Sequence, residues 1–147
     1  MPSTYAHYRM GQEVIKQVSV PAHDIIMKHK QLYDIGLHGP DILFYYHPLV
    51  TNPVNAIGYG LHERSGKYFF GKAAEIIETA SDKEAALAYI YGFICHFALD
   101  STCHGYIDEK IVQSGVSHTE IEVEFDRSLM IEDGKDPVRQ DLTKHIV

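Results

Sequence analysis

The sequence predicts an all-α fold. Apolar residues recur mainly at helical spacing, and the alternation of β-branched residues that marks strands is rare. Hydrophobic residues form 45% of the 147 residues and charged residues 22%, which is typical of a globular protein. Because no repeat and no Gly/Ser linker divides the chain, we expect a single domain over residues 1–147.

The first half of the chain carries signals for three helices and a turn. Ser3 or Thr4 is placed to cap a helix, and Pro21 suits the first turn of a second helix that stops at Gly36. A Gly-Pro pair then breaks regular structure, and Asn52 precedes a proline at the start of another helix. The expected elements are helices over about 4–18, 21–35 and 52–65, a turn over 37–41 and an apolar segment over 42–46.

The second half is expected to contain the longest helix. Ser81 and Glu84 match the Ser-x-x-Glu capping box that opens it. Gly115 breaks the chain, and Ser117 with Glu120 matches the same box for the following helix. The expected helices of this half span about 68–79, 82–104 or slightly beyond, 117–132 and 138–146.

The charge balance argues against nucleic acid as a general partner. Thirteen basic and twenty acidic residues give a net charge of −7, opposite in sign to a nucleic-acid-binding surface and unfavourable for docking on anionic lipid. No apolar run reaches the roughly 18 residues of a transmembrane helix, and no signal-peptide pattern is present. We therefore expect a cytoplasmic protein. Cys95 and Cys103 would lie about 12 Å apart along one helix, too far for a disulfide.

Ten histidines in 147 residues are an unusual number that requires an explanation. Histidine is costly to bury without a partner and is the commonest metal ligand. His96, Asp100 and His104 are spaced i, i+4 and i+8, so they fall within an arc of about 80° on the longest helix. The next helix carries His118 and Glu122, again four residues apart.

A single His-x-x-x-carboxylate pair is usually only a hydrogen-bonded pair on a helix. Two such pairs and a further histidine within residues 96–122, on largely apolar helices, would be expensive to bury without a cation. Imidazole and carboxylate are the ligands of catalytic zinc sites, and facing helices of a bundle can hold a multinuclear centre. The sequence therefore predicts a helical bundle with a multinuclear metal site between its helices.

This ordered set of motifs resembles the bacterial zinc-dependent phospholipase C family, whose fold is shared with fungal-type single-strand-specific zinc nucleases. The family has a His-x-x-x-Asp helix, a further His, and then His-x-x-x-Glu. These motifs follow an N-terminal His, an Asp in a Gly-Pro-Asp-like loop and a His about one helix later. The resemblance covers residues 1 to about 127. It implies that the metal ligands are His7, Asp41, His62, His96, Asp100, His104, His118 and Glu122.

The resemblance also implies two or three zinc ions, although iron, nickel or cobalt can replace zinc in such sites. The first ion would be held by Asp41, His62, His96 and Asp100. The second ion would be held by His104, His118 and Glu122. The third would be held by His7, the N-terminal amino group and a shared Asp100, whose two oxygens allow it to bridge two ions.

Three features depart from the family pattern. Only three residues separate Asp100 from His104, whereas the secreted enzymes have a longer gap, so the second ligand set is expected to be shifted. The chain begins with Met1 and contains no tryptophan, whereas the secreted enzymes use a tryptophan amine as a ligand, so the third site is expected to be weaker or absent. Because only 25 residues follow Glu122, the fold is expected to be shortened relative to the family, with exposed apolar faces that favour a homo-oligomer.

Two further histidines have two interpretations each. His47 is either a partly exposed turn residue or a ligand in place of His62. His38 is either a solvated loop residue or a hydrogen-bond partner of Asp41, because ligand carboxylates usually have such partners.

Two segments beside the expected ligands also remain open. The aromatic residues at 44–46 either pack in the core or line a pocket for a cationic head group such as choline. Asp126 either pairs with Arg127 or supports the ligands from outside.

The function that these residues favour is a metal-dependent phosphoric-ester hydrolase resembling phospholipase C. Zinc lowers the pKa of a bound water toward 7, and Asp41 would serve both as a ligand and as the carboxylate that orients or deprotonates the water. The expected substrate is a phospholipid or another phosphodiester. The alternatives are a nuclease-like phosphodiesterase and a non-catalytic helical domain stabilised by metal.

Overall fold

The computed structural model describes residues 4–146, apart from the side chain of His145, and every regular element in that range is helical. This confirms the all-α prediction. The elements are α1 (Thr4–Ile15), α2 (Val20–Lys28), α3 (Lys30–Gly36), η1 (Gly39–Tyr45), α4 (Pro53–Glu63), α5 (Gly66–Thr79), α6 (Lys83–Ser114), α7 (His118–Glu132) and η2 (Lys144–Ile146).

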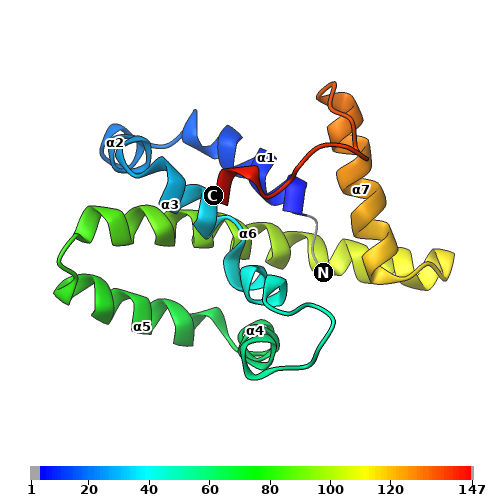
Figure 1. Ribbon diagram of the computed structural model, residues 1–147, viewed down its shortest axis with the longest axis horizontal. Helices are drawn as coiled ribbons and strands as arrows, with labels where there is room; N and C mark the ends of the chain where they lie inside the picture. Colours follow the sequence, from blue (N-terminus) through cyan, green and yellow to red (C-terminus); the bar gives the residue numbers. More distant parts are fainter. Residues whose placement is uncertain (1–3, 147) are drawn as a thin grey trace.

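Helix α6 is the central element of the fold (Figure 1). Its 32 residues contact α1, α2, α3, α5, α7 and η1. Helix α5 runs back along the first half of α6, and α7 rises from the opposite end (Figure 1). No helix within residues 4–146 combines the length and the apolar character needed to cross a membrane.

Helices α3 and α6 cross with their backbones in contact. A Cβ atom added to Gly36 would lie 2.1 Å from the carbonyl oxygen of Tyr89, and one added to Gly92 would lie 2.1 Å from the carbonyl oxygen of Tyr33. Only glycine leaves room for this approach. The crossing brings the segment after α3 onto the face of α6 that carries His96.

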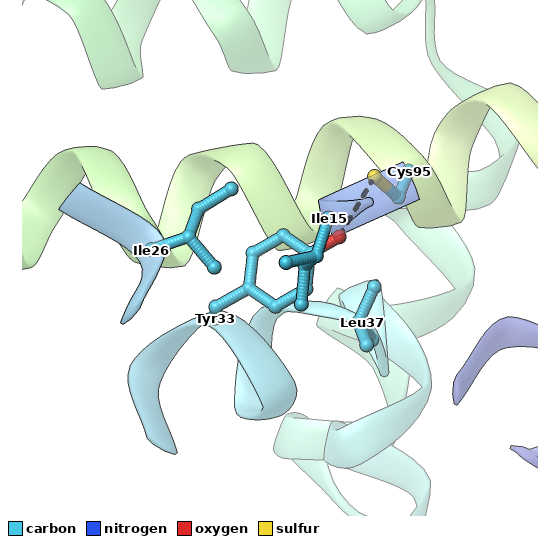
Figure 2. Close-up of a cluster of buried hydrophobic side chains, with 5 residues drawn as sticks. All are labelled: Ile15, Ile26, Tyr33, Leu37 and Cys95. Atoms are coloured by element: carbon cyan, nitrogen blue, oxygen red, sulfur yellow. Dashed lines mark hydrogen bonds between the residues drawn. The ribbon is translucent and has the colours of Figure 1, made fainter. Parts of the chain in front are cut away.

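A small apolar core fills the angle between α1, α2, α3 and α6 (Figure 2). Its buried members are Ile15, Ile26, Tyr33, Leu37 and Cys95. The Tyr33 hydroxyl donates a hydrogen bond to the carbonyl oxygen of Gly11 (2.9 Å) and lies 3.4 Å from the Cys95 sulfur. Cys95 and Cys103 are both free thiols, as their spacing predicts.

Several helix ends lie where the sequence predicts them. The Asn52 side chain accepts hydrogen bonds from the backbone N–H groups of Val54 and Asn55 at the start of α4. Ser117 caps α7 by accepting from the N–H of Glu120, and Gly115 ends α6 in the left-handed conformation.

The predicted boundaries of two helices are wrong. The helix expected over 21–35 is broken at His29, whose φ of −121° and ψ of 42° are not helical, so α2 and α3 meet α6 as separate segments. The longest helix is capped by Asp82 rather than Ser81, because the Asp82 carboxylate reaches the N–H of Ala85. That helix also continues to Ser114, well beyond its expected end.

The helix expected over 138–146 does not form, apart from the short η2 turn. The Asp136 carboxylate accepts from the N–H groups of Val138 and Arg139, and Asp141 accepts from the N–H of Thr143. These local side-chain bonds favour turns over a helix. The turn expected over 37–41 is, by contrast, partly helical, because the 3₁₀ helix η1 begins at Gly39, whose φ is +52°.

Candidate metal centre

Four segments bring predicted ligands together around the middle of α6. Helix α6 itself supplies His96 and Asp100, while α1, η1 and α4 supply His7, Asp41 and His62 respectively. Two groups of ligand atoms, each within 4.8 Å of one another, belong to His7, Asp41 and His96 and to His62, His96 and Asp100. His96 is therefore shared between the two groups.

Asp100 uses both carboxylate oxygens within this cluster. Its Oδ1 lies 3.2 Å from His7 Nε2, and its Oδ2 lies 3.2 Å from His96 Nε2 and 4.0 Å from His62 Nε2. Burial alone would raise the pKa of Asp100, but the adjacent imidazoles of His7 and His96 hold it well below its ordinary value. Asp100 is therefore an anion placed between three imidazoles.

Backbone carbonyl groups orient two of the imidazoles. His96 Nδ1 lies 3.1 Å from the carbonyl oxygen of Leu37, and His62 Nδ1 lies 2.8 Å from that of Gly58. A carbonyl oxygen only accepts, so each Nδ1 carries the proton and each Nε2 is directed to the carboxylates. Gly39 packs against the His96 ring so closely that a Cβ there would lie 2.3 Å from His96 Cδ2.

Helix α7 fixes the position of His7 through its carboxylates. The Asp126 carboxylate accepts hydrogen bonds from the backbone N–H groups of Tyr5 (2.9 Å) and Ala6 (2.7 Å), at the start of α1. The next residue, His7, stacks on His96 with ring centroids 4.0 Å apart. Asp126 thus caps a helix 120 residues earlier in the chain, a contact between distant elements that residue spacing alone does not specify. Arg127 pairs instead with Glu124.

The chemistry of these residues fits a zinc ion. His96 Nε2 is buried without a hydrogen-bond partner among the described atoms, although Asp100 Oδ2 is only 3.2 Å away. The hydrogen bond to Asp41, whose Oδ1 lies 3.1 Å from His62 Nε2, raises the pKa of His62. A cation between these groups would satisfy the lone pairs of the imidazoles and the negative charge of the carboxylates.

The second predicted ligand set is more open. His118 Nε2 lies 2.8 Å from Glu122 Oε1, and the rings of His104 and His118 are 5.4 Å apart between centroids. Burial raises the pKa of Glu122 against the opposing effect of His118. Within the described residues, these side chains do not converge as closely as the groups around His96. The short gap between Asp100 and His104 places His104 one turn further along the uninterrupted α6, where it is exposed.

Three cavities meet at this centre, and Asp100 and His104 line all of them. The smallest, of about 210 Å³, also contacts His62, His118 and Glu122. A second, of about 240 Å³, lies toward α4 and α5 and is lined by phenylalanine rings and by Arg64. The largest, of about 490 Å³, lies between α1, α7 and the second half of α6. Ligands can therefore reach the centre from more than one direction.

The remaining predicted residues lie around the centre. His38 is buried with its Nδ1 3.0 Å from the Tyr45 hydroxyl, which lies 3.2 Å from Thr4 Oγ1. His47 is exposed in the turn after η1 with a φ of 45°, so it is a turn residue and belongs to neither ligand group. The N-terminal amino group, predicted as a third-site ligand, lies outside the described residues.

The three aromatic residues at 44–46 lie in different environments. Phe44 is buried against the rings of His62 and Tyr59 and lines the 210 Å³ cavity. Tyr45 faces His38, whereas Tyr46, which follows η1, is exposed. Of the three aromatic residues, Phe44 is therefore the one that shapes the centre.

The fold is all-helical, and it gathers buried carboxylates and imidazoles from separate helices. This arrangement is that of a helical metal-binding protein whose centre is open to ligands. More particularly, the chain belongs to the zinc-dependent phospholipase C family, whose model matches residues 6–146. The family match confirms the resemblance read from the ordered motifs and supports zinc as the metal. The searches of curated proteins and of solved structures gave no match to this chain.

Proposed function

We propose that this protein is a zinc-dependent phosphodiesterase that acts on a phospholipid-like substrate. The observation that supports this most directly is the position of Asp100, which faces three imidazoles and also lines three cavities. A purely structural metal site is closed, whereas a catalytic site leaves a position open to substrate. The family match supports a metal-dependent, phospholipase-like activity.

The residues that would hold metal are the five clustered around α6, which are His7, Asp41, His62, His96 and Asp100. A second set of His104, His118 and Glu122 would complete the centre toward α7. Zinc bound there supplies Lewis acidity toward a phosphoryl oxygen and lowers the pKa of water.

Asp41 is our candidate for the carboxylate that accepts a proton from the attacking water. It is buried in η1, with Oδ1 3.1 Å from His62 Nε2 and Oδ2 3.8 Å from His96 Nε2. Because a carboxylate has two oxygens, Asp41 can hold a ligand position with one and receive a proton with the other. The backbone bonds to His62 and His96 keep both imidazoles in place during this transfer.

The test combines metal analysis with a phosphodiester assay. We expect the purified protein, prepared without chelator, to contain at least one zinc per chain and to hydrolyse a soluble phosphodiester until a chelator is added. The H96A variant should lose metal and turnover together. The H23A variant is the matched control, because His23 lies on α2 outside the centre and should leave both unchanged.

Three results would contradict the proposal. Metal content below about half an ion per chain would refute the zinc centre itself. Full metal content without turnover on phosphodiesters, phosphomonoesters or nucleic acids would favour the non-catalytic, metal-stabilised domain instead. Preferential turnover of single-stranded nucleic acid would favour the nuclease-like alternative.

A further inference from the structure

The largest cavity is an apolar extension of the metal centre. Its wall includes Leu99, Ile107, Val116, Ile121 and Phe125, contributed by the second half of α6, the connection to α7 and α7 itself. The charged residues that also line it are Lys110, Glu120 and Glu124. The same cavity reaches His7, Asp100 and Glu122 at its inner end. A molecule bound at the metal centre could therefore extend directly into this apolar space.

We propose that this cavity binds one hydrocarbon chain of the substrate, so that the enzyme prefers single-chain phosphodiesters over two-chain phospholipids. This inference rests on the proposed function, because it places the phosphodiester at the metal centre. The wall of the cavity recognises an apolar chain by burying it, and the polar ligands at the inner end set the position of the phosphate.

The size of the cavity limits what it can hold. An engineered cavity of about 150 Å³ accommodates one benzene, which has six carbons. The cavity here is about 490 Å³, so by proportion it holds on the order of twenty carbons. This is the content of one long chain, and two such chains would need about twice the space.

The neighbouring cavities do not offer an equivalent second space. The cavity toward α5 is about 240 Å³, half the size of the largest cavity. The cavity between α4 and α7 is about 210 Å³ and is lined mainly by the predicted ligands. A second long chain would therefore remain in water, where it gains no apolar contact.

The test measures binding and turnover separately on the zinc-loaded full chain. Alkyl phosphocholines with four, eight or twelve carbons, kept below micelle-forming concentrations, serve as single-chain phosphodiesters. Dodecanoyl lysophosphatidylcholine and didodecanoyl phosphatidylcholine, presented at equal mole fraction in mixed micelles, compare one twelve-carbon chain with two, because two chains of this length exceed the capacity of the cavity. In calorimetric titrations we expect affinity to rise by up to about fourfold for each added methylene that enters the cavity. The twelve-carbon single chain should bind at least tenfold more tightly than the two-chain compound.

A cavity-filling variant localises the effect. I107W places an indole in the cavity and should weaken binding of the twelve-carbon compound at least tenfold while the four-carbon compound binds as before. V112W is the matched control, because Val112 is 86% exposed on the same helix and is not part of the cavity wall. If I107W does not fold, the chain-length series on the parent protein decides the question.

The outcomes separate this inference from the proposed function. Chain-length-dependent binding without turnover would refute the proposed activity and leave the chain site standing. Turnover of small phosphodiesters with affinity independent of chain length, or equal binding of the two-chain compound, would overturn the chain site alone. Dimerisation that V112W preserves and I107W abolishes, without any chain-length effect, would assign the cavity to a second copy of the protein and also overturn it.

Discussion

Replacing Asp126 with alanine removes the carboxylate that joins α7 to the start of α1. Asp126 is buried and accepts two backbone N–H groups, from Tyr5 at 2.9 Å and from Ala6 at 2.7 Å. A hydrogen bond to a charged group contributes about 1.5–3 kcal/mol, and loss of a helix cap costs about 0.5–2 kcal/mol. Because the two bonds share one carboxylate, we expect D126A to lower the free energy of unfolding by about 3 kcal/mol.

The assay is urea unfolding followed by circular dichroism, with zinc content measured on the same samples. For a chain of this size, a loss of that magnitude corresponds to a melting temperature lower by roughly 6–12 °C. The conservative variant D126N keeps an acceptor oxygen and should lose about half as much. Because His7 follows Ala6 directly, D126A should also lower zinc content more than D126N does.

Asp136, four residues after the end of α7, provides a matched control. Its carboxylate also accepts two backbone N–H groups, from Val138 and Arg139, but it is exposed. D136A should therefore cost less than about 1 kcal/mol, because water replaces the lost bonds. A D126A variant no less stable than D136A, with unchanged zinc content, would refute the reasoning that the buried cap holds α1 in place.

Three further predictions concern the centre, the pH dependence and the helix crossing. D100A should lose more zinc and more thermal stability than E122A, because Asp100 faces three imidazoles and Glu122 faces one. Equal losses of zinc by elemental analysis and of stability by calorimetry would contradict this. The hydrogen bond from the Tyr5 hydroxyl lowers the pKa of Asp133. The ionised Asp133 therefore stabilises the folded protein above about pH 4, and this contribution is lost as the pH falls further. In acid titrations monitored by urea unfolding, D133N should therefore lose less stability than the parent, and parallel curves would exclude the effect. G92A should lower the free energy of unfolding by about 1–3 kcal/mol, because the added Cβ meets a backbone oxygen. G60A, whose Cβ would enter open space on α4, should be neutral or stabilising. Similar values for both variants would rule out the close crossing of α3 and α6.

The sequence determines those parts of the structure that depend on neighbours a few residues away. The caps at Asn52 and Ser117 and the break at Gly115 are local hydrogen-bonding and backbone preferences, and the structure contains them where they are expected. The four-residue spacing of His96 and Asp100 also suffices to place both on one face of a helix. Local geometry therefore made the all-α class and the central ligand pair predictable.

The convergence of distant ligands was predictable only by resemblance to a family. No spacing rule connects His7, Asp41 and His62 to α6, because these residues lie on separate elements whose packing depends on the whole fold. The ordered motifs of a known family carry that information, and the family match supports it. The structure adds that these side chains lie within a few ångströms of one another.

Tertiary structure alone decided the features that depend on long-range contacts. Asp126 caps α1 across 120 residues, Gly39 admits the His96 ring, and the helix break at His29 lets α2 and α3 meet α6 separately. The cavity beside the centre likewise arises only when α1, α6 and α7 come together. These features reflect which surfaces meet when the chain packs, and a helical periodicity specifies that a face is apolar without specifying the surface that covers it.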